Sequence, residues 1–231
     1  MRRIGVTLRV DVWGARGERR DAIDQRWVEL LTACGCLPVL LPNHMRAVQS
    51  LVEQLPLHGF VLTGGGDLAT YGGASPERDE VERWLLDYAS AHVVPLLGVC
   101  RGMQAIQHRW GVPLAPVEGH VATRHLVCEP DSTAARSSYG NGGQLRSNVA
   151  ASPASAVPRN SYHCYGARAT VAELAVTAVA EDGVIEAVAH RRLPIRGIMW
   201  HPEREQPFAA SDLRMIQLLF RGENAHEHDS R

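Results

Sequence analysis

The sequence lacks an excess of either charge sign, and it lacks any long apolar run. Lys and Arg total 24 against 25 Asp and Glu, so no global field favours nucleic acid or an anionic membrane as a partner. No apolar stretch approaches the roughly 20 residues of a membrane span, and the opening MRRIGVTLRV lacks the apolar core of a signal peptide. These absences predict a cytoplasmic protein that binds neither nucleic acid nor a membrane.

Common cysteine motifs are lacking as well. The five cysteines are odd in number, and the spacing of Cys34 and Cys36 matches no common zinc or redox motif. A reducing compartment fits this usage best. We expect Cys34, Cys36, Cys128 and Cys164 to be core or loop thiols.

Strands and helices alternate in the first half of the chain. Apolar runs predict strands at 3–10, 37–41, 59–63 and 93–99, and helical spacing predicts helices at 21–35, 44–55, 75–91 and 101–111. Ser75 is the expected cap of the third helix, and Gly35 and Gly111 are expected stops. This alternation predicts an α/β fold, a three-layer sandwich around a central, mostly parallel sheet.

The second half changes character. Residues 112–160 are rich in Pro, Gly, Ser and Ala, which predicts short strands and loops, with a turn at YGNGGQL (139–145). Asp182-Gly183 predicts a hairpin between two strands, and a closing helix capped by Ser211 follows the strand IRGIMW. We expect an antiparallel extension of the sheet, one domain over residues 1–222 and a polar tail at 223–231.

One cysteine stands where an apolar strand ends and a helix begins. In PLLGVCRGMQ, Gly98 and Gly102 flank Cys100 at two residues on either side, the cysteine analogue of the nucleophile elbow. The following helix would direct its positive end at the sulfur, which favours the thiolate. Free cysteine is also among the most buried residue types, so a core role for Cys100 stays open on this motif alone.

A thiolate nucleophile needs a base, and the base needs an orienting partner. In GIMWHPERE, His201 follows an apolar strand, and Glu203 is two residues on, where Pro202 lets its carboxylate fold back to the imidazole. In VLTGGGDL, three glycines after a buried strand can present a backbone N–H to an oxyanion, opposite that of Arg101. The stretch lacks the GxGxxG and Gly-Lys-Ser/Thr patterns of phosphate loops, although a plain loop remains an alternative.

Taken together, these stretches resemble the class I glutamine amidotransferase-like fold, which is related to flavodoxin-like sandwiches, and within it the γ-glutamyl hydrolase family. The resemblance rests on IGVTLRV, GFVLTGGGDL, ERDEVE, PLLGVCRGMQ, NSYH, EDGVIEAV and GIMWHPERE, which occur in the family's order. It implies a Cys100 nucleophile, a His201 base and a Glu203 partner, with no metal and no organic cofactor.

The resemblance also implies binding residues. Oxyanion donors would be Arg101 N–H and Gly64 or Gly65, and the glutamyl end of a substrate would lie by Gln104 and the Ser161, Tyr162 and His163 segment. Contacts to a leaving group are expected from three residues of EGHVATRH, namely His120, Arg124 and His125. Arg78 and Asp79 match an Arg-Asp pair of the family, for which a structural ion pair is an equal alternative.

The similarity is strongest to short bacterial hydrolases of γ-glutamyl-CDP-amidate in capsule synthesis. Hydrolysis of γ-glutamyl-γ-aminobutyrate is an alternative, and so is a glutaminase subunit that supplies ammonia to a synthase partner. A non-enzymatic binding module is the third class, although the intact Cys-His-Glu set argues against it. We expect a small-molecule γ-glutamyl substrate, and a homo-oligomer is left open.

Overall fold

The computed structural model describes residues 1–128 and 156–221 together with the backbone of residues 144–146. Its main sheet has nine strands in the order β10-β8-β13-β14-β15-β6-β5-β1-β4. One part is parallel: β15 (Ile195–Ile198), β6 (Leu96–Val99), β5 (Gly59–Leu62), β1 (Arg2–Thr7) and β4 (Cys36–Leu41). The other part is antiparallel: β10 (Val157–Tyr162), β8 (Val121–Cys128), β13 (Leu174–Ala180) and β14 (Ile185–His190).

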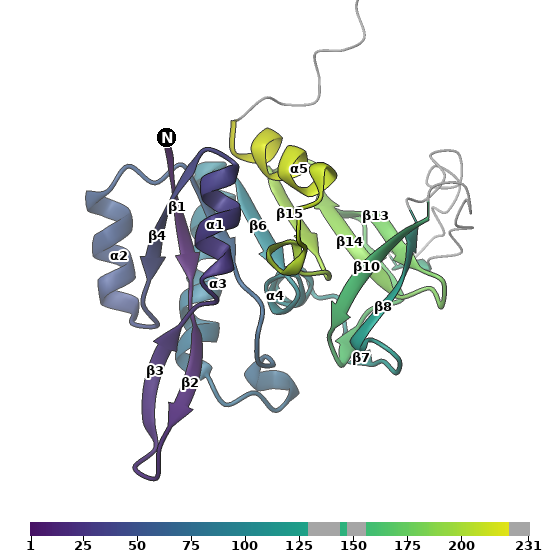
Figure 1. The fold of residues 1–231 in the computed structure, drawn as a ribbon, viewed down its shortest axis with the longest axis horizontal. Helices are drawn as coiled ribbons and strands as arrows, with labels where there is room; N and C mark the ends of the chain where they lie inside the picture. Colours follow the sequence, from purple (N-terminus) through teal and green to yellow (C-terminus); the bar gives the residue numbers. More distant parts are fainter. Residues whose placement is uncertain (129–143, 147–155, 222–231) are drawn as a thin grey trace, which may run out of the picture.

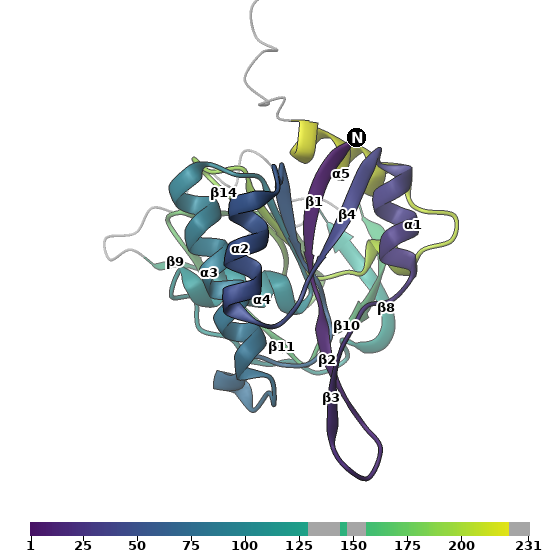
Figure 2. The ribbon, with the colours of Figure 1, turned by 90° about the vertical axis from the view of Figure 1, so that its left-hand side faces the viewer.

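Helices cover both faces of the parallel part (Figure 1). In Figure 2, α2 (Met45–Gln54), α3 (Pro76–His92) and α4 (Arg101–Arg109) lie on one side of β1 and β4, and α1 (Arg26–Ala33) and α5 (Ala210–Arg221) lie on the other. Two apolar clusters match these layers, one including Leu85 and Ile106 and the other including Trp27 and Ile216. Strands buried on both faces become continuous apolar runs, as seen in β5 and β6. The predicted α/β sandwich is confirmed.

The segment between β1 and α1 differs from the prediction. The strand expected at 3–10 ends at Thr7, and a separate hairpin of β2 (Arg9–Trp13) and β3 (Glu18–Ala22) projects from the sheet (Figure 1). The helix expected from residue 21 begins only at Arg26. Most residues of the hairpin are exposed, and positive φ angles at Gly14 and Gly17 form its turn, so no apolar periodicity announced it.

The helix ends agree only in part with the capping predictions. Gly35 and Gly111 have positive φ after α1 and α4, as expected of stops. Ser75 occupies the N-cap of α3, but its side chain makes no capping hydrogen bond. Ser211 lies inside the first turn of α5, which begins at Ala210, and its hydroxyl accepts a hydrogen bond from Arg159.

The antiparallel half contains short elements, as predicted for its described part. The Asp182-Gly183 hairpin is confirmed between β13 and β14, with a φ of 81° at Gly183. The other short strands of this half, among the described residues, are β7 (Ala115–Pro116), β9 (Gln144–Arg146), β11 (Tyr165–Gly166) and β12 (Ala169–Val171). The 3₁₀ turn η4 (Pro202–Arg204) follows β15, whereas the 3₁₀ turn η1 (Ala69–Tyr71) lies in the N-terminal half, after β5.

Two predictions fall outside the described part of the chain. They are most of the turn predicted at 139–145 and the tail predicted at 223–231. Across residues 1–128, 144–146 and 156–221, no helix is long and apolar enough to span a membrane.

Candidate active site

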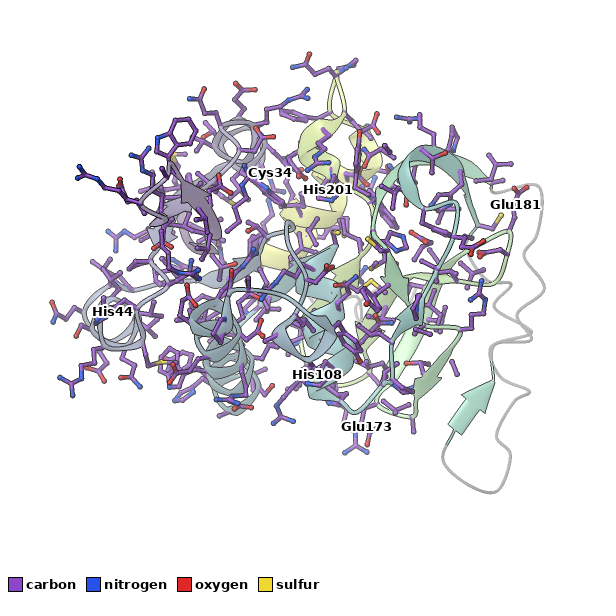
Figure 3. All side chains as sticks on the ribbon, turned by 90° about the horizontal axis from the view of Figure 1, so that it is seen from below. Cys34, His44, His108, Glu173, Glu181 and His201 are labelled. Carbon is purple, nitrogen blue, oxygen red and sulfur yellow. The ribbon has the colours of Figure 1, made fainter. Side chains whose placement is uncertain are left out.

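Three neighbouring parallel strands bring the predicted site together. β15, β6 and β5 lie side by side, with Ile198 opposite Val99 and Leu62 opposite Gly98. Cys100 follows β6 directly, and its N–H donates to the Ile198 carbonyl at 2.7 Å. Since carboxyl ends of parallel strands meet at one edge, the segments carrying Cys100, His201 and Gly64 converge there. His201 is buried and lies toward the middle of the view in Figure 3, whereas His44 and Glu181 lie toward its edges.

Cys100 occupies a sharp turn from strand to helix. Its φ of 53° and ψ of −107° are unusual for a residue with a Cβ, a conformation that costs about 1–3 kcal/mol. The flanking glycines are required by space: a Cβ at Gly98 would lie 2.5 Å from the Gly102 carbonyl oxygen, and a Cβ at Gly102 would lie 2.1 Å from the Leu62 oxygen. The elbow expected from Gly-x-Cys-x-Gly is therefore present, with α4 starting at the next residue.

The imidazole of His201 is held by a carboxylate. Its Nδ1–H donates to Glu203 Oε1 at 2.6 Å, across the turn that begins at Pro202. Its Nε2 is buried and makes no hydrogen bond to another described residue. The position of a Cβ on Gly64 would be 3.3 Å from both Cys100 Cβ and His201 Nε2, so the free ring nitrogen and the cysteine flank the same space.

The backbone of His201 is fixed by a residue that the sequence reading did not single out. The N–H of His201 donates to Asn160 Oδ1 at 2.9 Å, and Asn160 Nδ2 donates back to the His201 carbonyl at 2.9 Å. Asn160 is buried in β10 and belongs to the quoted NSYH stretch. A reciprocal side-chain to backbone pair of this kind has no local sequence signal, because its partners are 41 residues apart.

The environment favours the protonated form of His201. Burial by itself would lower its pKa, but the nearby Cys100 sulfur and the hydrogen-bonded Glu203 carboxylate outweigh burial and raise the pKa of His201 to about 9. At neutral pH the imidazole therefore carries a proton beside the sulfur. In contrast, burial and the nearby Cys36 raise the pKa of Cys34 to about 12, which keeps that thiol unreactive.

Arg78 orients the glycine turn after β5. Its guanidinium donates to the carbonyls of Thr63 at 2.5 Å, Gly64 at 3.2 Å and Gly65 at 2.7 Å. In a trans peptide the N–H points away from the preceding carbonyl, so the amides of residues 64, 65 and 66 face the side opposite Arg78. Arg101 is the first residue of α4, where the helix does not use its own N–H groups.

One buried carboxylate links the two segments that could bind an oxyanion, the glycine turn after β5 and the first residue of α4. Glu82 is bonded by Arg78 Nε at 2.8 Å, by the Arg101 guanidinium, and by the Thr7 hydroxyl at 2.8 Å. Burial would raise the pKa of Glu82, but Arg101 and Arg78 hold it below its usual value. Asp79 pairs with Arg101 and Arg78 pairs with Glu82, so both residues form structural ion pairs, although not with each other. Both segments are thus tied to one charge network.

The side chains expected near the glutamyl end of a substrate are mostly engaged within the protein. Gln104 Nε2 donates to the Tyr165 carbonyl at 3.0 Å, and the Ser161 hydroxyl donates to the His120 carbonyl at 2.7 Å. Tyr162 is 43% exposed and packs edge-on against His201, with ring centroids 5.6 Å apart. Tyr162 is therefore the member of this set that combines exposure with contact to the catalytic candidates.

The side chains expected near a leaving group also have partners in the protein. Arg124 Nη1 forms an exposed ion pair with Glu205 at 2.8 Å, and Nη2 donates to the Pro158 carbonyl. The rings of His120, His125 and His163 gather around Glu186, a residue of β14 that sequence reasoning missed as a site residue. Cys164, which follows His163 in the chain, is exposed.

An α/β sheet that presents a cysteine on a strand-to-helix turn, beside an imidazole held by a carboxylate, is the arrangement of a cysteine hydrolase. A model of the Peptidase C26 family matches residues 4–203, and the chain belongs to this family. The family and its relatives support a hydrolase.

Two curated relatives span nearly the whole chain. The chain is 26% identical to the gamma-glutamyl-CDP-amidate hydrolase of Campylobacter jejuni over 94% of both chains. It is 28% identical to the gamma-glutamyl-gamma-aminobutyrate hydrolase of Escherichia coli O157:H7, over 90% of this chain and 87% of that one. Among solved structures, a glutamine amidotransferase of Thermotoga maritima has the same fold, with a TM-score of 0.59 at 13% identity over 94% and 82% of the two chains.

Proposed function

We propose that the protein is a cysteine-dependent hydrolase that releases glutamate from a γ-glutamyl amide. The observation that carries the proposal is the pairing of a strained, strand-end Cys100 with a buried His201 whose free Nε2 flanks the same space. The Campylobacter and Escherichia relatives are named as hydrolases of γ-glutamyl compounds, which supports the substrate class.

The acylation step uses the geometry of these two side chains. The Cys100 thiolate attacks the γ-carbonyl carbon, and the carbonyl oxygen becomes an oxyanion facing the N–H groups of Arg101 and of Gly64 or Gly65. The imidazolium of His201 gives its proton to the amine nitrogen as the C–N bond breaks. A γ-glutamyl thioester on Cys100 and a free amine result.

The second step returns the enzyme to its starting state. His201, now neutral, takes a proton from water, and the hydroxide formed attacks the thioester carbonyl. The C–S bond breaks, glutamate leaves, and the proton remains on His201 beside the thiolate. Glu203 keeps the ring oriented throughout, because its 2.6 Å hydrogen bond fixes Nδ1 as the protonated nitrogen.

For the amine half we propose a nucleotide-linked phosphoramidate such as the CDP-amidate of the Campylobacter relative. The support is overall similarity, since that relative is covered over 94% of its length. The γ-aminobutyrate amide of the Escherichia relative is the competing small-molecule substrate, and an ammonia-supplying glutaminase subunit is the competing role.

A panel of γ-glutamyl amides tests the proposal directly. Glutamate release would be measured from γ-glutamyl-CDP-amidate, γ-glutamyl-γ-aminobutyrate and glutamine, with wild type and with the Cys100→Ala variant. Glutamate release by the wild type but not by Cys100→Ala supports the hydrolase, and the amide that is cleaved fastest identifies the substrate. Release by Cys100→Ala at the wild-type rate would refute it, and glutamine turnover only in the presence of a co-purified synthase would favour the glutaminase subunit.

A further inference from the structure

Four ligand-type side chains converge in the antiparallel half of the sheet. His120 precedes β8, His125 lies within it, His163 follows β10, and Glu186 lies in β14. One nitrogen or oxygen atom from each lies within 4.8 Å of the others. β10 and β8 are neighbours, and β13 separates β8 from β14 (Figure 1), so the tertiary structure assembles a group that is spread over 67 positions.

The spacing of these atoms matches a tetrahedral metal site. Glu186 Oε1 is 3.3 Å from His120 Nδ1, 3.3 Å from His163 Nε2 and 3.8 Å from His125 Nε2. His120 Nδ1 and His163 Nε2 are 3.2 Å apart. Zinc bonds of about 2.0–2.1 Å in a tetrahedron place neighbouring ligand atoms about 3.3 Å apart.

The outer nitrogens of two rings have the partners expected of metal-binding histidines. The Nδ1–H of His163 donates to the Tyr165 carbonyl at 3.0 Å, and the Nε2–H of His120 faces Asp182 Oδ2 at 3.4 Å. With the protons of neutral rings on these outer nitrogens, His163 Nε2 and His120 Nδ1 carry the lone pairs that a metal ion needs. Both lone pairs then face each other and the carboxylate.

Among the described residues, the three imidazoles are the only groups paired with the buried Glu186 carboxylate. The residue is 1% exposed, and neither carboxylate oxygen accepts a hydrogen bond of good geometry from a described residue. Both ring nitrogens of His125 are also buried without a hydrogen bond. A buried carboxylate surrounded by imidazole lone pairs is costly unless a cation occupies the space between them.

We propose that His120, His125, His163 and Glu186 bind a divalent transition-metal ion, with zinc as the best fit to this set of nitrogen and oxygen ligands. Four protein ligands close the coordination sphere, which is typical of a structural site and leaves no open position for substrate. The site would bind β8, β10 and β14 together. Tyr162 and Ser161 precede His163 in the chain, so the metal would also hold the segment that packs against His201.

Metal content tests this proposal without any assay of activity. The full chain, without a histidine tag, would be prepared with Cys100→Ala so that the catalytic thiol cannot bind zinc. Glu186→Gln and His125→Gln would each be added to this background, with His92→Gln as the matched control. His92 is exposed at the end of α3, where its ring stacks on Tyr88. Zinc per chain would be measured by inductively coupled plasma mass spectrometry after incubation with zinc and dialysis.

We expect one zinc per chain in the Cys100→Ala protein and in its His92→Gln control. Glu186→Gln and His125→Gln should bind zinc at least roughly a hundredfold more weakly. X-ray absorption at the zinc edge of the Cys100→Ala protein should show only nitrogen and oxygen ligands with imidazole scattering, a readout that holds even where a variant fails to fold. No zinc after reconstitution, equal zinc in folded Glu186→Gln, or sulfur in the coordination shell would overturn the proposal.

Discussion

Two buried clusters of imidazole and carboxylate in the described part of the chain are built in opposite ways. In the cluster of Cys100, His201 and Glu203, one carboxylate binds one ring at 2.6 Å, and the other ring nitrogen is free and flanks the same space as Cys100. In the cluster around Glu186, three rings converge on one carboxylate, and no thiol takes part. The first cluster keeps one ring nitrogen available for proton transfer, whereas the ligand atoms of the second cluster converge on a common centre.

The two clusters also differ in their position in the sheet and in the groups around them. The first lies at the carboxyl ends of parallel strands, the edge at which ligands bind in open α/β sheets. The second lies among antiparallel strands and is enclosed by protein partners such as Asp182 and Tyr165. Similar residue types therefore give a reactive site in one place and a closed ligand set in the other, and the following variants separate the two.

Removal of the sulfur should have the largest effect. Cys100→Ala should lower glutamate release by about 10⁴-fold or more, because no other group can form the thioester. Zinc bound at the Glu186 cluster should not change, since that cluster contains no thiol. Activity would be followed by coupled glutamate detection and folding by circular dichroism. A loss of both activity and metal would show that the clusters are not separable.

Loss of the Glu203 carboxylate charge should have the second largest effect on activity. Glu203→Gln should lower kcat by roughly 10²-fold or more, because the ring loses its oriented Nδ1 partner. In wild type, kcat/KM should decline as pH rises through about 9, the pKa to which Cys100 and Glu203 raise His201. The variant lacks one cause of that elevation, so its decline should begin at lower pH. Identical pH profiles would contradict the role of Glu203.

The same shift predicts a pH dependence of stability. Because the pKa of folded His201 is raised above the ordinary value of 6.5, its stabilising contribution is complete below pH 6.5 and is lost as pH rises through about 9. Urea unfolding of wild type and Glu203→Gln across this interval measures the contribution. A wild type whose stability declines no more than that of the variant would argue against the ion pair.

Crowding the space between Cys100 and His201 should cost about a hundredfold in kcat. A methyl group at Gly64 would lie 2.5 Å from His201 Cε1, so Gly64→Ala must displace the ring, and a displacement of about 1 Å can cost this much. Gly14→Ala is the matched control, because Gly14 has φ of 68° and no atom within 4 Å of the added methyl. The control should lose only about 1 kcal/mol of stability and keep its activity. Unchanged kinetics of Gly64→Ala would show that His201 Nε2 does not transfer a proton in the space beside Gly64.

Removal of metal should have the smallest effect on chemistry and a clear effect on stability. A ligand at a thousandfold excess over its Kd stabilises a fold by about 4 kcal/mol, which for a domain of this size is on the order of 10 °C in Tm. Chelator should therefore lower Tm by about that amount in wild type and in His92→Gln, while alkylation of Cys100 by a glutamine-like electrophile continues. An unchanged Tm would mean that the cluster around Glu186 binds no metal and is a hydrogen-bond network.

The N-terminal half was largely predictable because its signals are local. Apolar runs of four to six residues alternating with helical spacing indicated β4, β5, β6 and α2 to α4 within a few residues of their observed ends. The hairpin of β2 and β3 escaped because its exposed strands carry no periodic apolar pattern. Capping was predicted less well, since Ser75 and Ser211 are common cap residues whose hydroxyls have no capping role here.

By itself, the sequence determined the strand-end positions of Cys100, His201 and Glu203, because parallel strands end at one edge and the elbow glycines are local requirements of space. Only the tertiary structure decided which side chains meet at long range: Arg78 on the carbonyls of the glycine turn, Asn160 on His201, and three histidines on Glu186. The physical reason is that these contacts depend on strand order and on the direction of each side chain, and neither leaves a periodic trace in the chain.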